Sequence, residues 1–229
     1  MKSILLGILT IGIILAVLLC FDATRSASPQ SYFVQSTHTF YKRLDEQLSP
    51  KSVLFVGDSM VQGLAVSEIS EKAINFGIGT DTVSGVRTRL EEYKSKNSSE
   101  CLFISVGIND LLQRHSVAST LQEFTNLFRS LSKHPKVLIG EILPVRSLSP
   151  KLERVNGEIS ALNSMLAQEI ENYDNVLLVK QYDIFLERGN ELSDAYHIGD
   201  GLHLNAAGNR RWIDHLKQQL RLNQCEIEN

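Results

Sequence analysis

The chain has 229 residues, of which 43% are hydrophobic and 21% are charged, and its formal net charge is −3. This is the composition of an ordinary globular protein, and a domain of about 200 residues can bury roughly 70% of its unfolded surface without help from metals or disulfides. The small negative charge and the lack of a long basic run exclude a nucleic-acid-binding surface.

The amino-terminal segment differs from the rest of the chain. After Lys2, residues 4–21 carry no charge, and a helix of that length spans about 27 Å, close to the thickness of a bilayer core. We expect residues 1–21 to form a membrane anchor. A cleaved signal peptide is the alternative, although the best cleavage site, at residues 26–28, lies past the apolar stretch and is followed by Pro29. Both interpretations place the bulk of the chain outside the cytoplasmic membrane.

The next segment, residues 22–50, is predicted to contain a linker and a short helix. Residues 22–31 are rich in Ser, Ala, Pro and Gln, which is typical of a linker. Apolar residues then recur at near-helical spacing before Pro50, which predicts a helix that lies on the domain or near the membrane. These residues are Phe33, Phe40, Tyr41, Leu44 and Leu48.

From Lys51 onward, short apolar runs alternate with segments of helical period. The runs that indicate buried strands are Val53–Val56, Ala73–Phe76, Cys101–Val106, Val137–Ile142 and Val176–Val179. The clearest helix has apolar residues at steps of three and four from Leu152 to Ile170, and two more are predicted around residues 117–131 and 212–220.

This alternation predicts an α/β fold in which helices cover both faces of a parallel sheet. We expect a three-layer α/β/α sandwich with a five-stranded, flavodoxin-like sheet over residues 51–222. Residues 223–229 are predicted to be a tail.

The three cysteines, Cys20, Cys101 and Cys225, are far apart and odd in number. They form no CxxC or Cys/His pattern, so neither a zinc site nor a disulfide framework is expected. Cys101 begins an apolar run and is expected to be a small buried hydrophobic residue. A bridge between Cys101 and Cys225 remains open.

Ligands of open parallel sheets bind outside the carboxyl ends of the strands, so the residues just after each apolar run are the candidates for a functional site. Asp58 and Ser59 follow the first run. They form a helix cap under one interpretation, and Ser59 is a nucleophile at the edge of the sheet under the other.

A nucleophilic hydroxyl requires a base, a group that orients the base, and donors for the oxyanion. Asp200 and His203 are three residues apart, which allows the carboxylate to hold the imidazole. His197 is the second candidate for the base. Asn109 offers an amide donor at a neighbouring strand end, and the N–H groups of a helix start beside Ser59 favour negative charge.

The chain from about Val53 to Leu216 resembles the SGNH (GDSL-type) hydrolases in four blocks. They are "GDSMVQ" around Ser59, "NFGIGTDT", "GIND" and "DGLH", in that order. Within the family, the first two blocks are most similar to the catalytic subunits of intracellular platelet-activating-factor acetylhydrolase and their bacterial relatives.

The resemblance implies a role for each matching residue. Ser59 would be the nucleophile, His203 the base and Asp200 its orienting partner. The side chain of Asn109 and the backbone N–H of Ser59 would be donors in the oxyanion hole.

One position departs from the family pattern. Many relatives have a glycine whose N–H completes the oxyanion hole where this chain has Thr80, with Gly79 one residue earlier. A backbone N–H survives at Thr80. If the position requires a positive φ, however, a β-branched residue is strained there.

These observations predict a membrane-tethered serine esterase that acts outside the cytoplasmic membrane without a cofactor or metal. The resemblance suggests a short acyl group on a small-molecule, carbohydrate or lysolipid-type ester. Two other hypotheses are an acyltransferase that passes the acyl group to a sugar, and a non-catalytic binding module on the same scaffold. The expected partners are the ester substrate and, through residues 4–21, the membrane. The sequence carries no indication of an oligomeric state.

Overall fold

The computed structural model describes residues 29–187 and 189–225. The chain divides into two compact units, Met1–Ser36 and Thr37–Asn229. The anchor expected at residues 1–21 lies outside the described residues. Among the helices that are described, none has the length and apolar character needed to cross a membrane.

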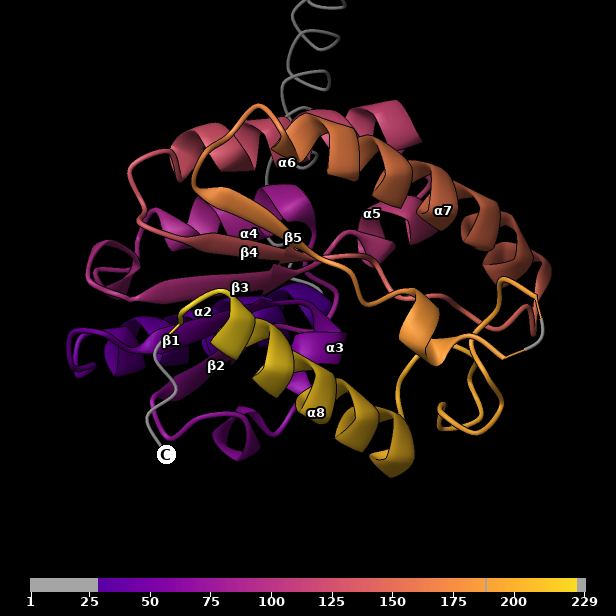
Figure 1. The fold of residues 1–229 in the computed structure, drawn as a ribbon, viewed down its shortest axis with the longest axis horizontal. Coiled ribbons are helices and arrows are strands. Elements are labelled where there is room, and N and C mark those ends of the chain that lie inside the picture. Colours follow the sequence, from indigo (N-terminus) through magenta and orange to yellow (C-terminus); the bar gives the residue numbers. More distant parts are fainter. Residues whose placement is uncertain (1–28, 188, 226–229) are drawn as a thin grey trace, which may run out of the picture. The chain divides into compact units, whose positions relative to one another are not determined.

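The core of the second unit is a five-stranded parallel sheet in the order β2-β1-β3-β4-β5 (Figure 1). The strands are β1 (Val53–Gly57), β2 (Ala73–Gly77), β3 (Cys101–Ser105), β4 (Val137–Gly140) and β5 (Val176–Val179). All five predicted strands and the flavodoxin-like arrangement are therefore confirmed. The third and fourth apolar runs extend past their strands because Val106 and Ile142 continue into the core beyond the hydrogen-bonded ladder.

Helices cover both faces of the sheet, which confirms the three-layer sandwich. One face packs against α4 (Val83–Leu90), α5 (Ile108–Leu112), α6 (Val117–Ser130) and α7 (Pro150–Ile170), and the other against α3 (Ser59–Gln62) and α8 (Ala206–Leu222). Side chains alternate along β1: Leu54 and Val56 face the first layer, whereas Val53 and Phe55 face the second. Short 3₁₀ turns lie at Val66–Glu68, Ser95–Asn97 and Asp183–Phe185.

The helix expected before Pro50 is α2 (Pro29–Asp45), which begins inside the segment predicted to be a linker. Proline is compatible with the first turn of a helix, so Pro29 does not delay its start. The Tyr41 hydroxyl donates a hydrogen bond to the Gly77 carbonyl at 2.9 Å, and the Asp45 carboxylate accepts from the backbone N–H of Ser95 at 3.1 Å. The end of α2 therefore lies on the folded domain, the first of the two placements predicted for this helix.

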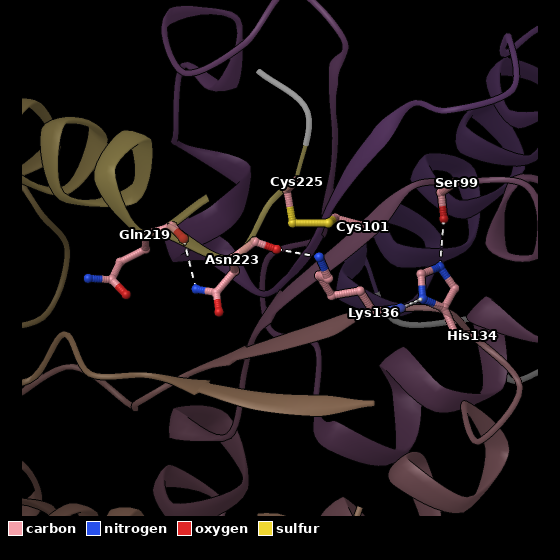
Figure 2. Close-up of a disulfide and its surroundings, with 7 residues drawn as sticks. All are labelled: Ser99, Cys101, His134, Lys136, Gln219, Asn223 and Cys225. Carbon is pink, nitrogen blue, oxygen red and sulfur yellow. Dashed lines mark hydrogen bonds between the residues drawn. A yellow bond between two sulfur atoms is a disulfide. The ribbon is translucent and has the colours of Figure 1, made fainter. Parts of the chain in front are cut away.

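Residues 223–225, the described part of the predicted tail, are joined to the sheet by a disulfide between Cys101 and Cys225 (Figure 2). Cys101 begins β3, Cys225 lies just after α8, and their Cα atoms are 5.7 Å apart. The Lys136 ammonium also donates to the Asn223 carbonyl. The bridge that the sequence left open between these two cysteines is therefore present. Their spacing could not predict it, because the pairing depends on where α8 ends.

Candidate active site

Ser59 lies at the sharp turn between β1 and α3. Asp58 is the N-cap of α3, and its carboxylate accepts a hydrogen bond from the Met60 N–H at 2.9 Å. Ser59 is the first helical residue, and its Oγ lies 2.9 Å from Nε2 of His203. The helix-cap interpretation and the nucleophile interpretation are therefore compatible, since Asp58 forms the cap and leaves the Ser59 hydroxyl to the histidine.

His203 is held from its other side by Asp200. Nδ1 of His203 lies 2.6 Å from Oδ2 of Asp200, while Oδ1 of Asp200 accepts from the backbone N–H groups of Leu202 and His203, both at 2.9 Å. A carboxylate at Nδ1 keeps the ring proton on that nitrogen, so Nε2 faces Ser59 as an acceptor.

The environment of Asp200 favours its charged form. Partial burial alone raises the pKa of Asp200, but the hydrogen bonds from the His203 side chain and from the two backbone N–H groups outweigh it. The pKa of Asp200 therefore lies below its ordinary value. The carboxylate is therefore charged near neutral pH.

The predicted oxyanion donors line the neighbouring strand ends. Thr80 has φ 70°, and its N–H has no acceptor among the described residues. The Gly79 N–H, in contrast, donates to Oε1 of Gln62 at 2.9 Å. The structure therefore leaves the N–H of Thr80, and not that of Gly79, available to a substrate oxygen.

The two other predicted donors also retain N–H groups. The Asn109 amide donates one hydrogen bond to the Asp81 carbonyl at 2.9 Å, and an amide nitrogen carries a second N–H. The backbone N–H of Ser59 is at the first position of α3, where no acceptor exists within the helix. Gly107, just before α5, has φ 120°, a conformation that favours glycine and that turns the chain from β3 toward Asn109.

A buried charge network lies beneath these donors. Nε of Arg89 donates to the Asp81 carboxylate at 2.7 Å, and its Nη2 donates to the Gly57 carbonyl at 3.1 Å. Sequence reasoning missed Arg89. Its signal is a charged residue on the buried face of α4, between Val86 and Leu90, where only a partnered cation is tolerated.

Asp58 is buried beside this network, and burial raises its pKa to about 7. The Met60 N–H and Arg89 act in the opposite direction, and the nearby carboxylates of Asp81 and Asp110 contribute to the rise.

A largely apolar pocket is lined in part by the sequence neighbours of Ser59 and His203. Asp58 and Met60, on either side of Ser59, and Leu202, next to His203, are in its wall, and its volume is about 20 Å³. The other apolar lining residues are Val106, Ile108, Ile142, Leu143 and Pro144. A water-sized group needs roughly 10–15 Å³ by the same measure, so the pocket accepts one or two such groups.

His197, the second candidate for the base, does not contact Ser59. Its imidazole lies within the loop that carries Asp200 and His203 and binds backbone N–H groups there. Within the described part of the chain, no group of three or more His, Cys, Asp or Glu side chains is arranged to hold a metal ion.

Comparison with known proteins identifies the class. The GDSL-like lipase/acylhydrolase family matches residues 55–211, which include every predicted site residue. The subunit alpha2 of human platelet-activating factor acetylhydrolase IB is 28% identical to this chain over 173 residues. These residues cover 72% of this chain and 74% of that one.

Two solved structures share the fold. A GDSL-like lipase from Bacteroides thetaiotaomicron has a TM-score of 0.71 and 18% identity, over 81% of this chain and 98% of the other. The acetylxylan esterase Axe2 from Geobacillus stearothermophilus has a TM-score of 0.60 and 18% identity, over 79% of this chain and 96% of the other.

Fold and family together define a carboxylic ester hydrolase. The chain belongs to the GDSL-like lipase/acylhydrolase family, the SGNH hydrolases. The predicted family resemblance and the predicted enzyme class are both confirmed, and a non-catalytic binding module is set aside.

Proposed function

We propose that this hydrolase cleaves short-chain acyl esters, acetyl esters first, through an acyl-enzyme on Ser59. The observation that carries the proposal is the continuous chain of hydrogen bonds from Ser59 Oγ through His203 to Asp200. It supplies the nucleophile, the base and the group that orients the base, in the geometry that hydroxyl activation requires.

In the proposed reaction, Ser59 Oγ attacks the ester carbonyl as its proton passes to Nε2 of His203. The carbonyl oxygen becomes an oxyanion that accepts from Asn109 and from the N–H groups of Ser59 and Thr80. The tetrahedral intermediate collapses, and the alcohol leaves with the proton from His203. Water then attacks the acyl-serine, with His203 as base again, and releases the carboxylic acid.

The small pocket supports the choice of acyl group. Its wall includes Asp58, Met60 and Leu202, the sequence neighbours of Ser59 and His203, and we infer that it receives the acyl chain carried by Ser59. Its volume of about 20 Å³ suits the methyl of an acetyl group and excludes a long chain without rearrangement. Two of the similar proteins are named for acetyl esters, a platelet-activating factor acetylhydrolase and an acetylxylan esterase.

We also propose that the enzyme works outside the cytoplasmic membrane. The uncharged residues 4–21 after Lys2 support an anchored or exported protein. The Cys101–Cys225 disulfide supports the same location, because disulfides persist in oxidising compartments and are rare in the cytosol. Fractionation tests this: the full chain should stay with membranes after alkaline carbonate washing, and a mature amino terminus between residues 23 and 32 would instead indicate a cleaved signal.

The catalytic proposal is tested by covalent labelling and by an ester panel. A fluorophosphonate should modify Ser59 in the folded protein, with no labelling of Ser59→Ala. In a p-nitrophenyl series, the acetate should have a higher kcat/KM than the octanoate. Adding a sugar acceptor measures how the acyl group partitions between water and the sugar. Stoichiometric labelling of another residue, or a preference for octanoate, would contradict the proposal.

A further inference from the structure

The loop between Ile198 and His203 carries both Asp200 and the candidate base. Side chains accept hydrogen bonds from most of the backbone N–H groups of this loop. The N–H groups of Leu202 and His203 donate to Asp200, and the Ile198 N–H donates to the His203 carbonyl at 3.0 Å. The N–H groups of Gly199 and Gly201 both donate to one atom, Nδ1 of His197, at 2.9 and 3.3 Å. His197 is therefore the internal acceptor of this loop.

This arrangement specifies the protonation state of the His197 ring. An atom that accepts two N–H groups carries no proton, so the ring proton of a neutral His197 lies on Nε2. Nε2 is 3.3 Å from Oδ1 of Asp194, so the carboxylate accepts a hydrogen bond from the Nε2–H group. The His197 side chain is only 7% exposed, so water does not readily replace either contact.

The same residues connect the loop to the chain that follows β4. Arg146 forms a two-pronged ion pair with Asp194, with Nε–Oδ1 at 3.0 Å and Nη2–Oδ2 at 3.1 Å. The backbone N–H of Arg146 donates to the Gly201 carbonyl at 2.8 Å. Gly201 is thus fixed through its carbonyl by Arg146 and through its N–H by His197.

The loop has little rigidity of its own. Gly199 and Gly201 have φ values of 105° and 73°, and a Cβ on Gly201 would lie 2.7 Å from the Arg146 carbonyl oxygen. Glycine is required for this conformation, and glycine is also the residue with the greatest conformational freedom. A fixed acceptor for both glycine N–H groups compensates for that freedom.

We propose that His197 is a positioning residue for the reaction: its unprotonated Nδ1 holds the loop so that Asp200 and His203 meet Ser59. The inference rests on the catalytic roles proposed for these three residues. His197 touches neither Ser59 nor the pocket, so its effect passes through the placement of His203. Changing it should lower kcat with little change in KM.

Two substitutions distinguish the role of Nδ1 of His197 from that of Nε2. In His197→Asn, the amide oxygen can occupy the place of Nδ1 and accept both glycine N–H groups. In His197→Gln, the amide reaches the place of Nε2 and no acceptor remains at Nδ1. We expect His197→Gln to lose about tenfold to a hundredfold in kcat, the scale on which small misplacements act, and His197→Asn to stay within about threefold of the wild type.

The measurements are kcat and KM on p-nitrophenyl acetate, the rate of fluorophosphonate labelling of Ser59, and the melting temperature of each variant. Equal activity in the two variants, or full activity in His197→Gln, would overturn the inference. Should His197→Gln melt below the assay temperature, Asp194→Ala is the second test. Asp194 is exposed, and its loss removes the contact at Nε2 that orients the His197 ring, so kcat should fall while unchanged kcat would refute the role.

Ser59→Ala and His203→Ala are assayed alongside these variants. If both are inactive and His197→Gln is fully active, the inference about His197 fails and the proposed function stands. If Ser59→Ala or His203→Ala retains full activity, the proposed function itself fails.

Discussion

Ser59 Oγ and His203 Nε2 lie 2.9 Å apart, although 144 positions separate the two residues in the sequence. The first residue is fixed by the end of β1, and the second by the loop that leads into α8. Parallel strands bring all their carboxyl ends to one edge of the sheet, and that edge is where the two side chains meet.

Asp200→Asn should lower kcat by up to about 10⁴-fold while the domain stays folded. The amide can donate to Nδ1 of His203, which moves the ring proton to Nε2 and leaves no acceptor for the Ser59 hydroxyl. Steady-state kinetics with circular dichroism as the folding control measure this. A folded variant with wild-type kcat would show that Asp200 does not orient the base.

Thr80→Gly should raise the free energy of unfolding by about 1 kcal/mol and keep or increase activity. Thr80 has φ 70°, where a β-branched side chain is strained and glycine is not. Its backbone N–H is unchanged by the substitution. Asn109→Ala is the contrasting variant and should lose on the order of 10²–10³ in kcat. Proline is no probe at this position, because its φ near −65° cannot match 70°. Urea unfolding and kinetics decide the outcome, and a less stable Thr80→Gly protein would refute the strain argument.

Asp58→Asn should stabilise the protein more at pH 8 than at pH 4. Burial raises the pKa of Asp58 from 3.8 to about 7, so the folded state prefers the protonated carboxyl. The stability that the protonated carboxyl provides is fully present below the unfolded-state pKa of 3.8. It is lost as the pH rises through the folded-state pKa of about 7. The loss amounts to as much as about 4 kcal/mol at higher pH.

Asparagine mimics the neutral acid and retains an oxygen for the Met60 N–H. Melting curves of Asp58→Asn and wild type from pH 4 to pH 8 test the effect, with Ser59→Ala as the neighbouring control. The difference in melting temperature should widen as the pH rises. A difference that shrinks would reverse the sign of the proposed pKa shift.

The double variant Cys101→Ser/Cys225→Ser should lose about 2–5 kcal/mol of stability and retain its kcat at low temperature. The disulfide closes a loop across 124 positions, which restricts the unfolded chain strongly. It joins the start of β3 to the chain just after α8 (Figure 2). The site, in contrast, lies at the carboxyl ends of the strands. Urea unfolding with and without a reductant measures the difference. A large loss of kcat in the folded variant would show that α8 transmits the position of Cys225 to His203.

Leu202→Ala should shift the acyl preference toward longer chains. Leu202 is in the wall of the 20 Å³ pocket and next to His203 in the sequence, and its truncation to alanine removes three carbon atoms, Cγ and both Cδ methyls. We expect the ratio of kcat/KM for butyrate to that for acetate to rise at least severalfold. Leu222→Ala serves as the control, because Leu222 is an exposed leucine at the end of α8 and outside the pocket. An unchanged ratio would place the acyl group elsewhere.

The sequence by itself determined the layers of the fold and most of the candidate site. The strands are short and largely apolar, which is typical of a parallel sheet covered on both faces. β1, β3 and β4 are buried throughout, whereas the edge strands β2 and β5 are partly exposed. Ser59 comes just after the first of these strands. Asp200 and His203 are three residues apart in one loop, so their spacing alone predicts that their side chains are neighbours. Asn109 likewise follows β3 by a few residues.

Only the tertiary structure decided the contacts that join distant parts of the chain. Cys101 and Cys225 pair because α8 ends beside the start of β3. Thr80 has the available N–H because the N–H of Gly79 is taken by Gln62, a residue of another element. His197, a second candidate base in the sequence, proved to be the acceptor within its loop. Periodicity and propensity record which face of an element is buried, but the partner of a polar group depends on the docking of elements far apart in sequence, which no local pattern encodes.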